Sequence, residues 1–98
     1  MALPENKQVE IPITIAIGDT VKVRQMSEKG YDFKRGAGAA FAGNLEGSVS
    51  GLNWTVIVSL AASAQGTIAD HFNLVRVNTG TAGALGTDTE LVVSGKVL

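Results

Sequence analysis

Apolar residues alternate with polar ones along much of this chain, a period of two that is typical of half-buried β-strands. The clearest run predicts a strand over residues 9–17 whose inward positions are Val9, Ile11, Ile13, Ile15 and Ile17. Pro12 cannot donate to a strand ladder, so it marks this strand as an edge. Gly18-Asp19 fits a two-residue hairpin turn into a second strand over 20–25, with Val21 and Val23 facing inward.

The segment 26–38 is polar, contains glycine and has no period, so we expect a loop. Loops of this length usually contact a partner or the body of the protein. The candidate partner-binding residues are the basic and aromatic side chains of this loop and two charged residues of a polar N-terminal arm over 1–8: Lys29, Tyr31, Phe33, Lys34, Arg35, Glu5 and Lys7. Substitutions such as Arg35→Glu or Tyr31→Ala should then weaken attachment and leave folding nearly intact.

Alternation resumes in the second half of the chain, which predicts strands over 39–49, 54–60, 72–78 and 89–98. Trp54, Val56, Val58 and Leu60 share one face of their strand, so we expect Trp54 in the core and a cost of about 3–5 kcal/mol for Trp54→Ala. Short strands, frequent turns and no credible helix predict an all-β fold, a single antiparallel β-sandwich or jelly roll over 9–98 behind the arm over 1–8.

Size and composition narrow the possible functions. The chain has 98 residues, enough for one core, and 45% of them are hydrophobic, which argues against disorder. No apolar run reaches the length of a membrane span, and the first residues lack the apolar core of a signal peptide, so synthesis in a cytoplasm is the default expectation. The net charge is −1 with no basic block, which argues against nucleic-acid binding. With no cysteine there is no disulfide or thiolate metal site.

No set of residues has the composition of a catalytic or metal centre. His71 is the only histidine, and the aspartates stand in turn-like contexts where their side chains bond the backbone. We therefore expect no enzymatic activity, no cofactor and no bound metal. Arg76 lies between Val75 and Val77, so its charged group should either emerge at a sheet edge or pair with a carboxylate such as Glu46 or Glu90. Trp54 could alternatively stack on a sugar ring.

One resemblance bears on function. The runs Leu45-Glu46-Gly47-Ser48, Gly51-Leu52-Asn53-Trp54 and Leu74-Val75-Arg76-Val77 resemble the middle of discoidin-type jelly rolls. They are more similar still to the shortened domains of this pattern in virion proteins of tailed bacteriophages. Ser50 stands where the pattern has an aspartate, and the chain is shorter than a full discoidin domain, so the ligand-binding loops of that family are not implied. The resemblance implies a β-sandwich and a part of a virion.

These observations lead to one principal hypothesis: a non-enzymatic capsid decoration, or cement, protein on the surface of a phage head. Its partners would be the major capsid protein and further copies of itself, in a trimer before a dimer, because its edge strands need cover. The alternatives are a carbohydrate- or cell-surface-binding module of a phage fibre or tail, and a tail or adaptor component. The chain begins at methionine and ends in a predicted strand, which favours a stand-alone part.

Overall fold

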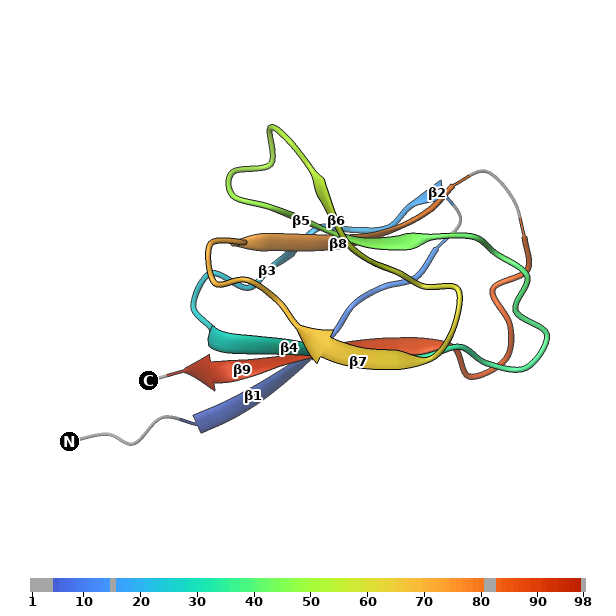
Figure 1. Ribbon diagram of the computed structural model, residues 1–98, viewed down its shortest axis with the longest axis horizontal. Helices are drawn as coiled ribbons and strands as arrows, with labels where there is room; N and C mark the ends of the chain where they lie inside the picture. The colour runs from blue at the N-terminus through green and yellow to red at the C-terminus, as the bar shows by residue number, and fades with distance from the viewer. Residues whose placement is uncertain (1–4, 15, 81–82, 98) are drawn as a thin grey trace.

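A computed structural model describes residues 5–14, 16–80 and 83–97. Within these residues the protein is all-β, with no helix, and its strands form two antiparallel sheets packed face to face (Figure 1). The strands are β1 (Glu5–Glu10), β2 (Ala16–Ile17), β3 (Val21–Lys22), β4 (Ser27–Lys34), β5 (Asn44–Ser48), β6 (Thr55–Ser59), β7 (Ala64–Thr67), β8 (Leu74–Gly80) and β9 (Glu90–Val97). The all-β, two-sheet part of the sequence prediction is therefore confirmed.

The first sheet, sheet A, has the strand order β1-β9-β4-β7. The second, sheet B, has the order β2-β8-β5-β6, and β3 also pairs with β8. The core lies between the sheets, where alternate residues of the long strands meet. Its apolar members are Ile11, Val23, Met26, Phe33, Phe41, Leu45, Leu60, Ile68, Phe72, Val75, Val77, Leu91 and Val93.

The beginning of the chain differs from the prediction. Residues 5–8 are not an arm, because β1 starts at Glu5 and pairs with β9 along its whole length. The expected arm residues 1–4 and the expected inward residue Ile15 lie outside the described part of the chain. Beyond Ile11, which is buried, the chain crosses from sheet A to sheet B. Pro12 lies in this crossing, where it interrupts no ladder. The single predicted strand over 9–17 is therefore wrong, and Ile17 is 53% exposed.

The predicted hairpin at Gly18-Asp19 is also wrong. Both β2 and β3 run antiparallel to β8, with Ile17 opposite Asn78 and Val21 opposite Val75, so they are two pieces of one interrupted strand. Gly18 is needed for a close approach, because a Cβ there would lie 2.7 Å from the Pro12 carbonyl oxygen. The prediction that Val23 faces inward is confirmed, because Val23 is buried, and its neighbour Lys22 is exposed.

The predicted loop over 26–38 contains β4, which lies between β9 and β7 in sheet A. In β4 the inward positions are occupied by Lys29, Tyr31 and Phe33, and a register shift between Ser27 and Gly30 interrupts its pairing with β9. The charged inward residue and this irregularity together hide the period of two. The predicted loop over 26–38 is therefore wrong, because most of this segment is the central strand β4.

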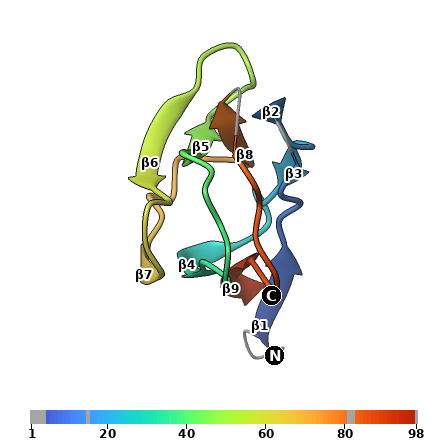
Figure 2. The same cartoon turned by 90° about the vertical axis from the view of Figure 1, so that its right-hand side faces the viewer.

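All four sheet edges carry features that hinder further strand pairing. In sheet A, β1 bears the charged residues Lys7 and Glu10, and β7 is only four residues long. In sheet B, the edge formed by β2 and β3 is interrupted, and β6 contains a bulge opposite β5. β9, the strand found within the predicted strand over 89–98, is paired on both sides in sheet A and is not an edge. Figure 2 shows β6 and β7 along one side of the molecule and β1, β2 and β3 along the other.

Candidate interaction surfaces

The structure separates the seven predicted partner-binding residues. Lys29 and Phe33 are buried, so the prediction that they lie in an exposed loop is wrong. Lys7 and Lys34 are exposed, Tyr31 and Arg35 are half-buried, and Glu5 begins β1. Contact of the exposed Lys7 and Lys34 and of the half-buried Tyr31 with a partner stays a prediction.

Lys29 holds β4 to the segment that precedes β8. Its side chain is 0% exposed, and its Nζ donates to the carbonyl oxygens of Met26 and Asp70, each at 3.3 Å. The Asp70 carboxylate lies 3.8 Å from the same Nζ and accepts a hydrogen bond from the Glu28 backbone N–H. A buried ammonium is tolerated when oxygen atoms surround it in this way. Lys29 is therefore a structural residue.

Arg35 is a second structural cation. Its Nη1 donates to the carbonyl oxygens of Phe41 and Leu60 at 2.8 and 2.9 Å, and its Nη2 donates to that of Ala39 at 3.2 Å. The guanidinium carbon lies 4.6 Å from the centroid of the Phe41 ring. With three backbone oxygens and an aromatic ring as neighbours, the guanidinium fixes the segment between β4 and β5. The guanidinium is not free to contact another protein, and we now expect Arg35→Glu to destabilise the fold instead of leaving folding nearly intact.

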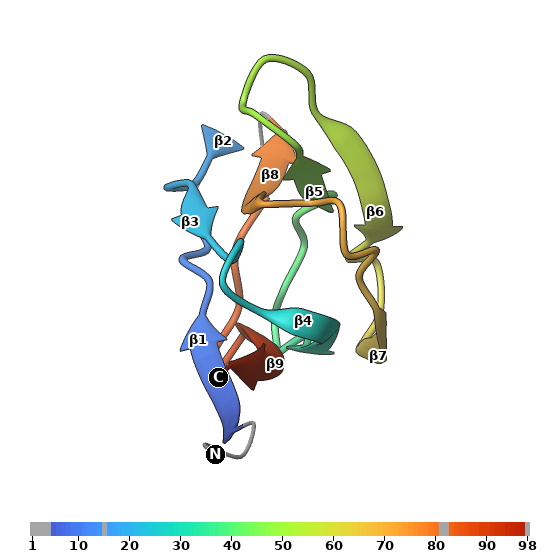
Figure 3. The ribbon, with the colours of Figure 1, turned by 90° about the vertical axis from the view of Figure 1, so that its left-hand side faces the viewer.

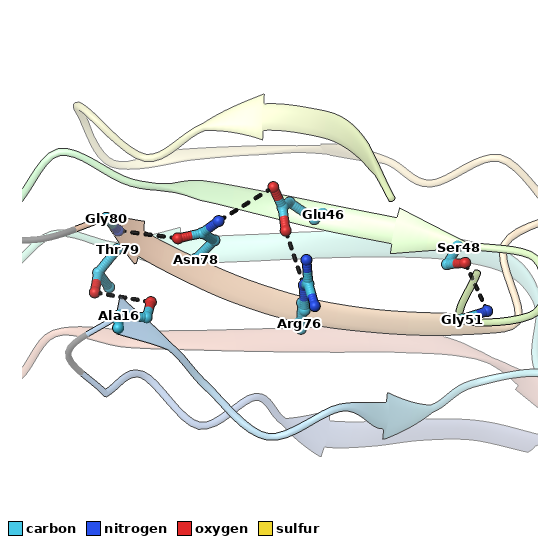
Figure 4. Close-up of polar contacts among 8 residues, drawn as sticks. All are labelled: Ala16, Glu46, Ser48, Gly51, Arg76, Asn78, Thr79 and Gly80. Carbon is cyan, nitrogen blue, oxygen red and sulfur yellow. Dashed lines mark hydrogen bonds and ion pairs between the residues drawn. The ribbon is translucent and has the colours of Figure 1, made fainter. Parts of the chain in front are cut away.

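An ion pair lies on the outer face of sheet B (Figure 4). Arg76 Nε donates to Glu46 Oε1 at 2.8 Å, so Glu46 is the partner among the two candidate carboxylates, Glu46 and Glu90. Asn78 approaches the other carboxylate oxygen at 3.5 Å. The Arg76 guanidinium carbon also lies 4.0 Å from the centroid of the Trp54 ring. The polar groups in the middle of this face are thus bound to one another.

Trp54 is half-buried on this outer face, so its predicted place in the core is wrong. The cause is a register shift in the pairing of β5 with β6: Leu45 is opposite Val58, but Glu46 is opposite Val56. The extra residue, Ile57, reverses the facing of the residues before it. Trp54 and Val56 therefore lie outside, where alternation alone would place them inside with Val58. With Arg76 stacked on it, one face of the indole is unavailable to a sugar ring.

We predict that Trp54→Ala costs about 1–2 kcal/mol, the sum of a partly exposed cation–π contact and limited apolar burial. Thermal melts of this variant would measure the loss. Val56→Ala, a truncation at an exposed site on the same face, is the control and should cost less than about 0.5 kcal/mol. A loss for Trp54→Ala as large as that of a core aromatic, about 4 kcal/mol, would contradict this placement.

Three of the four large hydrophobic side chains that are exposed among the described residues lie in the turn between β5 and β6 or in β6 itself. Leu52 is 85% exposed, Val49 55% and Val56 52%. Figures 1 and 3 show this turn projecting from sheet B on the side away from sheet A. Exposed leucine and valine side chains that gather at one place mark contact surfaces more often than scattered ones do.

Hydrogen bonds anchor the first residues of this turn. Ser48 Oγ accepts from the Gly51 N–H at 2.8 Å, and Gly51 has a φ of +93°, a conformation that favours glycine. Asn73 Nδ2 donates to the Val49 carbonyl oxygen at 2.9 Å, and the Asn73 N–H donates to that of Ser48 at 3.0 Å. Leu52 therefore follows an anchored segment, and anchoring of this kind reduces the entropy cost of ordering a turn on contact.

Other possible sites are poorly supported. His71 is exposed and lies against Phe72, with ring centroids 4.2 Å apart. In the described ranges, no group of three or more His, Cys, Asp or Glu side chains is placed to hold a metal ion. The same ranges contain no helix long and apolar enough to cross a membrane. Comparisons with protein-family models, curated proteins and solved structures found no match to this chain.

Proposed function

We propose that this chain is a non-enzymatic structural protein of a bacteriophage virion, a decoration protein that binds the surface of the assembled head as an oligomer and stabilises it. The observation behind this proposal is the exposed apolar turn between β5 and β6, whose first residues are anchored by hydrogen bonds. It contains Gly51-Leu52-Asn53-Trp54, one of the runs that resemble phage virion proteins. In the proposal, this turn contacts the major capsid protein.

We further propose that the two sheets form a jelly roll. If β2 and β3 count as one strand, each sheet has four strands, and the orders β1-β9-β4-β7 and β2/β3-β8-β5-β6 are compatible with two interlocked Greek keys. Jelly rolls are common in viral capsid proteins and in lectins, so this topology supports the virion hypothesis only as an analogy of fold. The contact at the turn has to be tested directly.

We expect Leu52→Ser to reduce binding to expanded heads that lack this protein by more than about tenfold, because the loss of a hot-spot residue at the centre of an interface costs about 2 kcal/mol or more. Binding would be measured by co-sedimentation of the purified protein with the heads. The matched control is Ile17→Ser, which replaces another exposed aliphatic residue, 53% exposed, at the opposite edge of sheet B. Both variants should melt like the unsubstituted protein, since neither side chain belongs to the core.

The oligomer is tested in the same preparation. Light scattering of the free protein and of protein released from heads should give a mass of two or more chains of 10.1 kDa each, a trimer before a dimer. Because every sheet edge is protected, we expect the copies to meet through side-chain faces and not by extending a sheet. Unsubstituted protein that fails to sediment with heads, or a Leu52→Ser variant that binds like the Ile17→Ser control, would contradict the proposal.

A further inference from the structure

The outer face of sheet A has two rows of residues that the strand register places side by side. One row reads Gln8, Ser94, Gly30 and Thr67 across β1, β9, β4 and β7. The next row on the same face reads Glu10, Val92, Asp32 and Gln65. Directly opposed residues share a face of the sheet, so these side chains point away from the core.

The middle of this face is hollow. The central positions of the first row are Ser94 and Gly30, which have little or no side chain, whereas Gln8 and Thr67 stand on either side. A Cβ at Gly30 would lie 3.1 Å from the Gly66 carbonyl oxygen, so this part of the floor is closely packed even without a side chain. The resulting groove has a volume of about 540 Å³ and runs across all four strands. This volume falls in the range of small-ligand sites.

Most of the polar side chains that line the groove are neutral. Two carboxamides, Gln8 and Gln65, and two hydroxyls, Ser94 and Thr67, line it together with the Asp32 carboxylate. Among the described residues, none of these five side chains is hydrogen-bonded to another protein group, in contrast to Glu46, Arg76 and Asn78 on sheet B. The groove therefore has donors and acceptors available to a ligand.

Other classes of ligand fit less well. No lysine or arginine lines the groove, and the Asp32 carboxylate would repel an anion. A peptide that adds a strand needs a free sheet edge, but the groove lies over the middle of the sheet, where β9 and β4 are paired on both sides. Amides and hydroxyls can donate and accept at once, which matches the hydroxyl groups of a sugar. Val92 provides an apolar contact for the C–H groups of a ring.

We propose that this groove binds a neutral oligosaccharide. Its residues are Gln8, Asp32, Gln65, Thr67, Val92 and Ser94, and none of them belongs to the turn proposed to bind the head. The site is open to solvent on one side, so each sugar ring contributes little, and the affinity is low for a single copy. Several copies on one particle would raise the avidity for a surface that displays many sugar chains.

The test is a titration of the full chain, labelled with ¹⁵N, with neutral trisaccharides of glucose, galactose or N-acetylglucosamine. At least one of them should shift the backbone amide signals of Gly30, Gly66 and Ser94 and leave those of Leu52 and Trp54 unchanged. Ser94→Phe fills the groove and should abolish these shifts. The matched control is Ser59→Phe, the same change at an exposed position of β6 in sheet B, and it should leave binding unchanged. Asp32→Asn should weaken binding about tenfold, the loss of one charge-assisted hydrogen bond.

Thermal melts would first establish that the variants are folded. The proposal is overturned if none of the three sugars causes shifts at its highest soluble concentration, if the shifts cluster around Trp54, or if they persist in Ser94→Phe. The outcome is independent of the head-binding assay. A protein that binds a sugar in the groove but no heads would contradict the proposed function alone, and the reverse result would contradict this inference alone.

Discussion

Arg35→Ala is expected to destabilise the protein by about 3–5 kcal/mol, a large part of the stability of a domain of this size. The variant removes the donors for three backbone carbonyl oxygens, those of Ala39, Phe41 and Leu60. A hydrogen bond from a charged donor contributes more than a neutral one, and oxygens left without a donor in a partly buried place add a desolvation cost. The stacking contact with Phe41, a core residue, is lost as well.

Urea denaturation would measure this loss as a shift of the unfolding midpoint at a constant slope. Arg35→Lys should recover only part of the stability, because an ammonium lacks the planar fork that reaches several carbonyls at once. Lys34→Ala, at the exposed neighbouring position, is the control and should change the free energy of unfolding by less than about 0.5 kcal/mol. An Arg35→Ala midpoint equal to that of this control would show that the guanidinium contacts are not needed.

Glu46→Gln should cost about 2–3 kcal/mol, because it leaves the Arg76 guanidinium without a counter-charge in a place where water has little access. The two side chains are only 12% and 19% exposed, and their 2.8 Å contact lies beneath Trp54 and beside Asn78. The loss is smaller than for a fully buried pair, since the guanidinium keeps some solvent contact. It exceeds that of an ordinary surface pair, which is worth at most about 1 kcal/mol.

A double-mutant cycle separates the pair from the packing around it. Glu46→Gln, Arg76→Met and the double variant would be unfolded in urea under identical conditions. The double variant should be clearly more stable than the sum of the two single losses predicts, because removing both charges leaves none unpaired. Additive losses would mean that the ion pair does not contribute as a unit.

The sequence predicts the parts of this fold in which alternation is uninterrupted. The predicted strand over 72–78 corresponds to β8, and the predicted strand over 89–98 corresponds to β9. In β9, Leu91 and Val93 are buried as expected. The sequence also indicated a carboxylate partner for Arg76, with Glu46 and Glu90 as candidates, but only the register of β5 with β8 shows that the partner is Glu46. In β8 and β9, the alternation of apolar and polar residues follows directly from which side chains are buried.

The rest depends on contacts between segments that lie far apart in the sequence. Lys29 is buried only because Asp70 and the carbonyl oxygens around it receive its charge, and a local reading of a lysine gives an exposed position. Trp54 changes sides because of a single extra residue in β6, which becomes visible only when β6 is aligned with β5. The short strand β7 has no strong strand preference and forms because β4 offers it a partner.

The groove on sheet A was missed for a related reason. Gln8, Ser94 and Thr67 are unremarkable polar residues in the chain, and they become neighbours only through the register of four strands. The exposed turn at Leu52, in contrast, is local, and its glycine and asparagine already indicated a turn. The sequence did not indicate that the Leu52 side chain is exposed to solvent.

The place of β9 in sheet A decides when this protein can fold. Among the described strands, β9 comes last in the sequence, yet it lies between β1, which comes first, and β4. A nascent chain on the ribosome therefore cannot close sheet A until β9 has emerged, and β1 lacks its partner strand until then. Pairing segments that lie far apart in the sequence requires a costly loop closure, which slows folding relative to domains built from local contacts. Throughout that interval the inner apolar side of β4 is open to chaperones and to other nascent chains.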